Sequence, residues 1–164
     1  MEKLTIAVDP GLGGGYALFD GTDLFQFDGF RESPITEEST LEFFRELMSN
    51  EEIEISFVLE KVPLYIPGRG PQHASRIGKM LLQYGQLWGF FKSFESARVS
   101  FLEVSPQKWQ AVFHTDIIDT GEENHKFALR EVACKLYPQL NCHLKKVQNA
   151  VCDAILIGHW HLNQ

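Results

Sequence analysis

Apolar and polar positions in the first sixty residues alternate between strand-like and helix-like patterns. Residues 3–9 form an almost continuous apolar run, typical of a buried strand, and residues 14–20 form a second run beyond a glycine-rich turn. Alternation over residues 23–30 predicts a third strand. An apolar stripe over residues 36–49 predicts a helix with polar caps, and the run over residues 53–62 predicts a fourth strand.

The pattern after residue 62 favours helices. Residues 63–71 hold three prolines and two glycines and predict an exposed loop. A long helix is expected over about residues 72–94, and a fifth strand over residues 98–104. A short helix is expected over residues 105–113, because it begins with a serine cap followed by proline. The last expected elements are a polar loop over residues 114–123 and helices over about 124–136 and 146–161.

The order of these elements predicts the fold class. Three antiparallel strands followed by helix-linked strands are typical of an α/β domain with a mixed five-stranded sheet and helices on both faces. A chain of 164 residues fits one such domain, spanning residues 1–164. The order is similar to that of ribonuclease H-like nuclease domains, in which the first and fourth strands are neighbours.

The charge of the chain is unevenly distributed, although the net charge is −7. Residues 1–60 hold 14 acidic and 3 basic residues, whereas residues 61–164 hold 8 acidic and 12 basic residues. Five basic residues and no acidic one stand between Glu60 and Glu95. Because local patches decide phosphate binding, the negative net charge does not exclude a nucleic-acid ligand. A solvated helix face explains the same run equally well at this point.

The cysteines and the hydropathy bear on the cellular compartment. Cys134, Cys142 and Cys152 are odd in number and show no C-x-x-C spacing, which predicts reduced and mostly buried thiols in a cytoplasmic protein. No apolar run is long enough for a transmembrane helix, so we expect no membrane partner.

Three carboxylates stand where a metal site would need them. Asp9 ends the first strand and Glu60 ends the fourth, so the predicted fold brings them side by side. Asp153 lies in an apolar helical run, where an acid is costly unless it is paired or binds a metal. Asn149 is four residues earlier on the same helix face. A strand-end charge facing water remains the alternative for Glu60, and a buried ion pair the alternative for Asp153.

These oxygen ligands suit two magnesium ions. Phosphodiester hydrolysis needs an activated water and charge stabilisation on both the attacking and the leaving oxygen, and two metals about 3.5–4 Å apart supply both. Asp9 is the expected bridging ligand.

Four segments, in order, resemble the successive motifs of the RuvC family of Holliday junction resolvases, and the likeness is closest to the phage-type branch. The segments are Val8-Asp-Pro-Gly11, Leu59-Glu-Lys-Val62, Val104-Ser-Pro-Gln-Lys-Trp109 and Cys152-Asp-Ala-Ile-Leu156. The likeness extends to Pro67-Gly-Arg-Gly70, Tyr84-Gly85, Gly89, Lys126, Arg130 and Leu136-Tyr-Pro138.

The resemblance implies a ribonuclease H-like fold and a homodimer that makes paired nicks in four-way DNA junctions. It implies Mg²⁺, with Mn²⁺ as a substitute, two ions per active site, and a cytoplasmic enzyme of bacterial or phage origin. The implied metal ligands are Asp9, Glu60 and Asp153, with Asn149 at the fourth ligand position. The family usually has an acid or histidine there, whereas Asn149 carries no charge. The aromatic residue that the family places three positions after the glutamate is Pro63 here, and Tyr65 is the nearest ring.

Basic and aromatic residues after Glu60 are candidates for DNA contacts, because such groups position phosphates and stack on unpaired bases. Lys126 matches a family lysine and is expected to stabilise charge on the scissile phosphate. Trp109 is predicted to pack beneath the short helix. The long helix is expected to form either the dimer interface or part of the intradomain core. The full set of expected DNA contacts is Lys61, Tyr65, Arg69, Arg76, Lys79, Lys108, Arg130, Lys145 and Lys146.

Three functions therefore remain open. The first is an active junction-resolving endonuclease, which the motif after Glu60 favours. The second is a related nuclease that acts on other branched DNA or on structured RNA. The third is a junction-binding protein with weak or no cleavage, because the uncharged Asn149 gives the site one charged ligand fewer than the family pattern.

Overall fold

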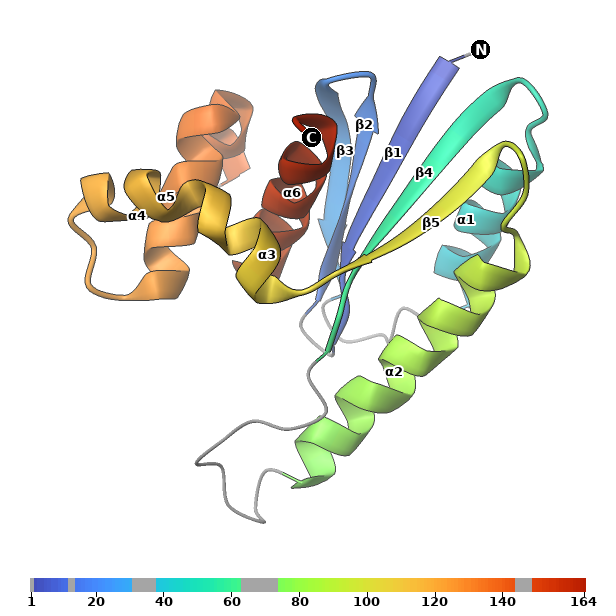
Figure 1. The fold of residues 1–164 in the computed structure, drawn as a ribbon, viewed down its shortest axis with the longest axis horizontal. Helices are drawn as coiled ribbons and strands as arrows, with labels where there is room; N and C mark the ends of the chain where they lie inside the picture. The colour runs from blue at the N-terminus through green and yellow to red at the C-terminus, as the bar shows by residue number, and fades with distance from the viewer. Residues whose placement is uncertain (1, 12–13, 31–37, 63–73, 144–148) are drawn as a thin grey trace.

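A single mixed sheet organises the chain (Figure 1). The computed structural model describes residues 2–11, 14–30, 38–62, 74–143 and 149–164. Its strand order is β3-β2-β1-β4-β5, with β1 antiparallel to β2 and parallel to β4. The predicted five-stranded mixed sheet is confirmed, as is the adjacency of the first and fourth strands. The strands are β1 (Glu2–Asp9), β2 (Gly15–Asp20), β3 (Asp23–Gly29), β4 (Ile53–Glu60) and β5 (Val99–Val104).

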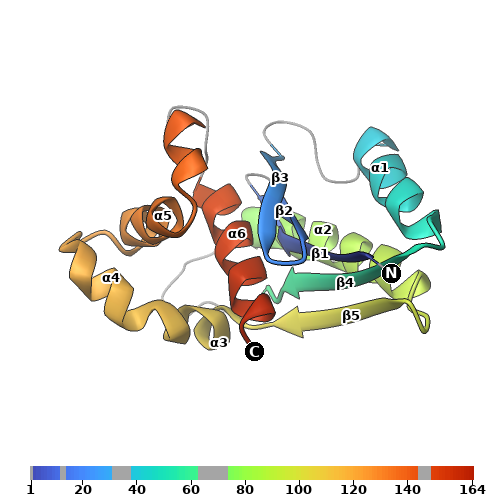
Figure 2. The same ribbon diagram turned by 90° about the horizontal axis from the view of Figure 1, so that it is seen from above.

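Helices cover both faces of this sheet, as predicted. Figures 1 and 2 show α1 and α2 on one face and α3, α5 and α6 on the other. The α-helices are α1 (Glu38–Ser49), α2 (Ala74–Ser93), α3 (Pro106–Gln110), α4 (His114–Thr120), α5 (His125–Leu136) and α6 (Asn149–Leu162). The 3₁₀ segments within the described residues are η2 (Ala111–Phe113) and η3 (Pro138–His143).

The period of two along β1 divides the interior into two cores. Ile6 and Val8 pack with residues of α1 and α2, whereas Ala7 packs with residues of α5 and α6. Both sets are almost completely buried. Since Asp9 is two residues beyond Ala7, the same alternation directs it to the face that α6 covers.

Helix α6 lies unusually close to the sheet because small residues stand at the contact. A Cβ at Gly15 of β2 would approach Val151 of α6 to 3.0 Å. A Cβ at Gly158 would collide with the ring of Phe19, which is fully buried. Ala17 is also fully buried in this core. The close packing fixes where α6 can present its side chains.

One predicted loop is wrong. Residues 114–120 form α4 instead, and the helix ends at Gly121, which has a φ of 69° and supplies a left-handed cap. None of the residues of α4 is buried. Its sequence therefore lacks the apolar stripe from which a helix is recognised, and this is why its polar composition favours a loop. A smaller difference is the end of β4 at Glu60 rather than at residue 62. Helix α6 is described from Asn149, and its expected start at about residue 146 lies outside the described residues.

Cys134 and Cys152 are buried free thiols, in agreement with the sequence. Burial raises the pKa of the Cys152 thiol to about 12, which keeps it protonated at neutral pH. Within the described part of the chain, no helix combines the length and the apolarity that a bilayer span requires.

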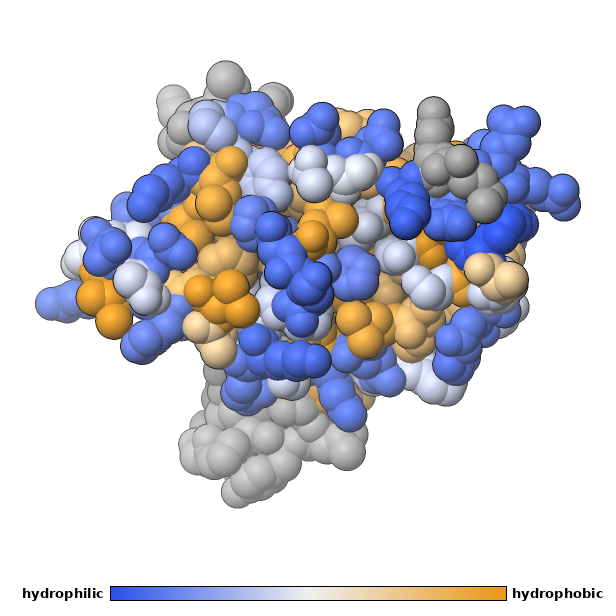
Figure 3. Space-filling model, turned by 45° about the horizontal axis from the view of Figure 1, so that its top comes forward, coloured by the Kyte–Doolittle hydropathy of each residue, from blue (hydrophilic) through white to orange (hydrophobic). Residues whose placement is uncertain are grey.

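Apolar side chains also reach the surface over the helices that extend beyond the sheet. Figure 3 shows such patches interrupted by hydrophilic side chains. Scattered exposure of this kind is normal for soluble proteins. The most exposed large apolar residues of this helical part are Val112, Ile118, Phe127 and Leu136.

The packing of α6 predicts a contrast between two glycine-to-alanine changes. Gly158→Ala should lower the free energy of unfolding by about 1–3 kcal/mol, because the new methyl group collides with Phe19. Gly85→Ala in α2 should raise it by about 0.5–1 kcal/mol in the monomeric chain, because no described atom of the chain lies within 4 Å of the new Cβ and alanine favours the helix. Urea denaturation measures both. Wild-type stability in Gly158→Ala would contradict the close approach of α6.

Candidate active site

Asp9 and Glu60 stand side by side at one edge of the sheet. Each is the last residue of its strand, and β1 and β4 are parallel neighbours whose register pairs Val8 with Leu59. The alternation of both strands directs the two carboxyl groups toward the face that carries α6. Glu60 is close enough to Asp9 to raise the pKa of the Asp9 carboxyl through charge repulsion and hydrogen bonding. The predicted meeting of these residues is therefore what the structure shows.

Asp153 reaches the same place from α6. Its neighbours Cys152 and Ala154 are fully buried, whereas Asp153 keeps partial exposure at the sheet edge. Lys126 lies in the first turn of α5, where Asn124 caps the helix by accepting a hydrogen bond from the Lys126 backbone N–H at 3.0 Å. The exposed ammonium of Lys126 acts electrostatically on both Asp9 and Asp153.

Crowding of like charges changes the acidity of the site. Burial raises the pKa of the Asp9 carboxyl well above its usual value; repulsion from Glu60 and Asp153 and the hydrogen bond with Glu60 raise it further, while Lys126 opposes the shift. Burial and repulsion from Glu60 raise the pKa of Asp153 to about 7, again against Lys126. The site thus holds more negative charge than its surroundings solvate, and a proton or a cation would relieve it.

The donor set suits a hard divalent cation. Asp9, Glu60 and Asp153 offer carboxylate oxygens, and Asn149, partly buried at the start of α6, offers an amide oxygen. Across the described ranges, however, no three His, Cys, Asp or Glu side chains are drawn together tightly enough to hold a metal ion by themselves. Mg²⁺ tolerates this, because it usually binds one or two carboxylates and takes its other ligands from water and substrate phosphates.

Trp109 contacts the site in a way that the sequence did not reveal. It is fully buried, which confirms the predicted packing under the short helix. Its indole Nε1–H also donates a hydrogen bond to Oε1 of Glu60 at 3.0 Å. A signal was present in the sequence, because an indole N–H predicted to be buried needs an acceptor. Which acceptor it meets depends on how α3 leaves the sheet.

The residues expected to contact DNA differ in exposure, and some of them lie outside the described part of the chain. Lys61 is exposed directly after Glu60, and Lys79 is exposed on α2. Lys108 is exposed on α3 with its ammonium 5.3 Å from the ring centroid of Trp160. Arg130 on α5 is half-buried and acts on the thiols of Cys134 and Cys152. Arg76 belongs to α2, but its side chain is outside the description, and the residues that lie wholly outside the described ranges are Tyr65, Arg69, Lys145 and Lys146.

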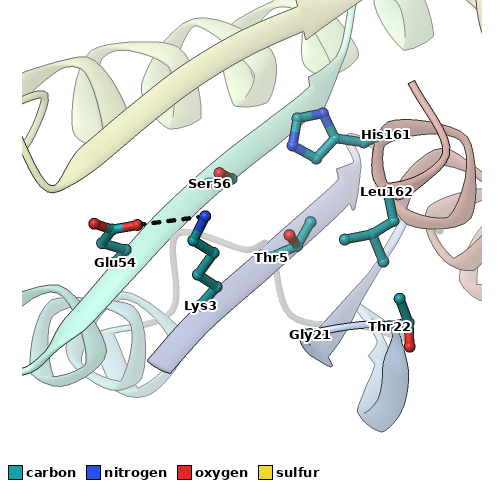
Figure 4. Close-up of a pocket in the computed structure, with 8 residues that line it drawn as sticks. All are labelled: Lys3, Thr5, Gly21, Thr22, Glu54, Ser56, His161 and Leu162. Atoms are coloured by element: carbon teal, nitrogen blue, oxygen red, sulfur yellow. Dashed lines mark ion pairs between the residues drawn. The ribbon is translucent and has the colours of Figure 1, made fainter. Parts of the chain in front are cut away.

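A hollow lies at the end of β1 and β4 opposite to Asp9 and Glu60 (Figure 4). Its volume is ≈ 400 Å³, and it contains an ion pair of 4.0 Å between Lys3 and Glu54. Lys3 precedes Asp9 by six residues, which is roughly 20 Å along a strand. One cation balanced by one anion does not favour a phosphate, so the carboxylate cluster is the better candidate for phosphodiester chemistry. The hollow is lined by Lys3, Thr5, Gly21, Thr22, Glu54, Ser56, His161 and Leu162.

The acidity of Asp153 predicts how stability depends on pH when metal is absent. Between about pH 4 and pH 7 the folded chain holds a proton on Asp153 that the unfolded chain has released, so stability falls as pH rises through this range. Asp153→Asn should flatten the fall and be more stable than wild type at pH 8, on the order of 2 kcal/mol, since partial exposure reduces the full effect.

Urea denaturation in EDTA at several pH values measures this difference. Asp119→Asn, at an exposed position of α4, is the matched control and should follow wild type. Equal pH dependence in wild type and Asp153→Asn would contradict the raised pKa of Asp153.

Comparisons with known proteins address the fold. No protein-family model matches the chain, and no curated protein matches its sequence. Among solved structures, Thermus thermophilus RuvC in complex with Holliday junction substrate is 15% identical with a TM-score of 0.52, covering 97% of this chain and 92% of that chain. A second Thermus thermophilus RuvC structure is 16% identical with a TM-score of 0.50, covering 96% and 92%. Over almost its whole length, the chain has the ribonuclease H-like fold of these RuvC structures.

Proposed function

We propose that the chain is a structure-selective DNA endonuclease that resolves four-way junctions by metal-dependent phosphodiester hydrolysis. The observation that carries this proposal is the gathering of Asp9, Glu60 and Asp153 from β1, β4 and α6 at one edge of the sheet. Burial and, after it, repulsion from Glu60 raise the pKa of Asp9 and of Asp153, which is the electrostatic condition of a site that takes up cations. The same fold occurs in an enzyme solved with a Holliday junction substrate.

In this proposal Asp9, Glu60 and Asp153 hold Mg²⁺, or Mn²⁺ in its place, with the amide oxygen of Asn149 at a fourth position. Two such ions would supply an activated water and neutralise charge on the attacking and leaving oxygens. The chain itself orients the carboxylates on rigid strand and helix ends. Lys126, which already acts on Asp9 and Asp153, stabilises negative charge on the scissile phosphate.

Branched DNA is the proposed substrate. Lys61 adjoins Glu60 and is exposed, so we expect it to contact a phosphate near the cleavage point. The excess of basic over acidic residues after residue 60 supplies the salt-dependent attraction that such binding requires. Stacking by Tyr65 and phosphate contacts by Arg69, Lys145 and Lys146 remain predictions from the sequence.

A homodimer is the proposed form, since a junction needs two matched nicks. One face of α2 supports it: a Cβ at Gly78, Gly85 or Gly89 would meet no atom within 4 Å, and Leu82 between them is 64% exposed. The sequence left open whether this helix forms a dimer interface or part of the core, and no described residue of the chain lies within 4 Å of a Cβ at these glycines. A second copy would fit against this smooth surface, as helices with small residues allow close approach.

A junction-binding protein without cleavage is the second candidate. Asn149 favours it, because an uncharged ligand at the fourth position weakens attraction for a second metal ion. The two candidates differ in their response to replacement of Asp9.

Cleavage of defined substrates tests the proposal. Purified protein is incubated with a synthetic four-way junction, a Y-fork, a duplex and a structured RNA, in Mg²⁺, Mn²⁺ or EDTA. We expect symmetric nicks in opposite strands of the junction, none in EDTA, and a loss of at least about 10³-fold in Asp9→Asn with binding retained. Binding without cleavage in the wild type, unchanged by Asp9→Asn, would instead support the second candidate, and cleavage of RNA alone would contradict a DNA endonuclease.

Lys126 permits a comparison within one helix. Lys126→Ala should lower the rate of junction cleavage about 10²–10³-fold, because the scissile phosphate loses a positive charge at close range. Lys135→Ala is the matched control: it is an exposed lysine in the last turn of α5 and should cut at the wild-type rate. Single-turnover rates with saturating enzyme separate this effect from weaker DNA binding. Equal cleavage rates in the two variants would show that Lys126 does not take part in the reaction.

A further inference from the structure

Two tryptophans of this chain donate to glutamates, and the two pairs have different surroundings. Trp88 on α2 donates from Nε1 to Oε2 of Glu103 at 3.1 Å, and Trp88 is 39% exposed. Trp109 donates to Oε1 of Glu60 at 3.0 Å, and Trp109 is completely buried. The first pair is open to water, which can replace either partner. In the second pair the indole N–H is closed to water whereas Glu60 is partly exposed, so the hydrogen bond holds Glu60 against a fixed donor.

Trp109 is held firmly by its surroundings. Its ring packs edge-on against Phe113, with ring centroids 6.2 Å apart and planes at 67°. Helix α3 is anchored as well, because Lys108 lies over the ring of Trp160 in α6. An indole N–H is a donor and never an acceptor, so rotation away from Glu60 would leave it buried and unpaired. The position of the donor is therefore set by the core, independently of Glu60.

The sheet register brings this donor to Glu60. Glu60 pairs with Val104 across the parallel strands β4 and β5, and α3 begins two residues after Val104. Ser105 caps the helix in an extended conformation, and its carbonyl accepts from the backbone N–H of Trp109 at 3.4 Å. The path of the chain from β5 into α3 thus places Trp109 beneath the carboxyl group at the end of the neighbouring strand.

We propose that Trp109 is a positioning residue for Glu60: its indole N–H fixes one carboxylate oxygen, so that the other stays available to the reacting site. A carboxylate on three rotatable bonds would otherwise sample several rotamers at the sheet edge. The inference rests on the proposed nuclease function for its catalytic consequence, whereas the contact itself is independent of any activity. Hydrogen-bond partners of metal-ligating side chains typically matter 10–100-fold for activity or metal affinity.

Activity provides the first test, with Trp88→Phe as a control that removes the same kind of hydrogen bond away from the site. Trp109→Phe should lower kcat for junction cleavage about 10–100-fold and leave KM within about twofold, because the DNA contacts are unchanged. Trp88→Phe should match wild type. If Trp109→Phe cuts as fast as Trp88→Phe while the wild type is active, the positioning role is overturned.

A spectroscopic test needs no activity and also covers the case in which Trp109→Phe fails to fold. The three tryptophans give three indole ¹H–¹⁵N signals, which Trp→Phe variants assign. Glu60→Leu, which cannot accept a hydrogen bond, should move the Trp109 signal and speed its hydrogen exchange, while the Trp88 signal stays in place. Titration of the wild type with Mg²⁺ should perturb the Trp109 signal in the same selective way.

The outcomes separate the two ideas. A wild type that cuts no substrate in any metal, combined with a selective shift in Glu60→Leu, would refute the proposed function and retain the contact. A wild type that cuts junctions, combined with an unmoved Trp109 signal in Glu60→Leu, would refute the positioning role and retain the function.

Discussion

The close contact between α6 and the sheet is the constraint on which the candidate site depends. Gly15 and Gly158 remove side-chain atoms where the helix crosses β2, so the helix comes near enough to place Asp153 beside two strand-end acids. The apolar residues around Asp153 pack α6 against the sheet, and they also exclude water from the carboxylates. Packing and acidity are thus two effects of one contact, since the burial that stabilises the core is the main cause of the raised pKa values.

Such an arrangement carries a cost in stability that the core must offset. Like charges gathered in a partly buried place oppose folding, and natural proteins accept this chiefly where function requires it. In the two strands that carry Asp9 and Glu60, the destabilising charges are limited to the strand ends. Their preceding residues alternate between two well-filled cores, and the acids stand at the strand ends, where a cation or solvent can reach them.

The strand order and the meeting of Asp9 with Glu60 could be predicted from the sequence, because both follow from local patterns of apolar and polar residues. Apolar runs that end in Asp9 and Glu60, together with the order of strands and helices, were enough to place the two acids side by side. The features that the sequence did not predict depend on tertiary structure. Helix α4 buries none of its residues, so its sequence has no apolar stripe from which a helix could be predicted. The bond from Trp109 to Glu60 depends on the register of β4 with β5 and on the direction of α3, and neither is encoded locally. Several expected DNA contacts, among them Tyr65 and Arg69, lie outside the described residues.

The pairing of β1 with β4 has a consequence for the order of folding. The β1–β2 hairpin is local and can form early, but β1 meets β4 only after the chain has closed a loop of about fifty residues, and α6 docks from still farther along the sequence. We therefore expect the three acids to come together late in folding. A partly folded or nascent chain would carry them on separate segments, with ordinary acidity and no shared site, so that any ability to cut nucleic acid would arise with the finished fold and not before it.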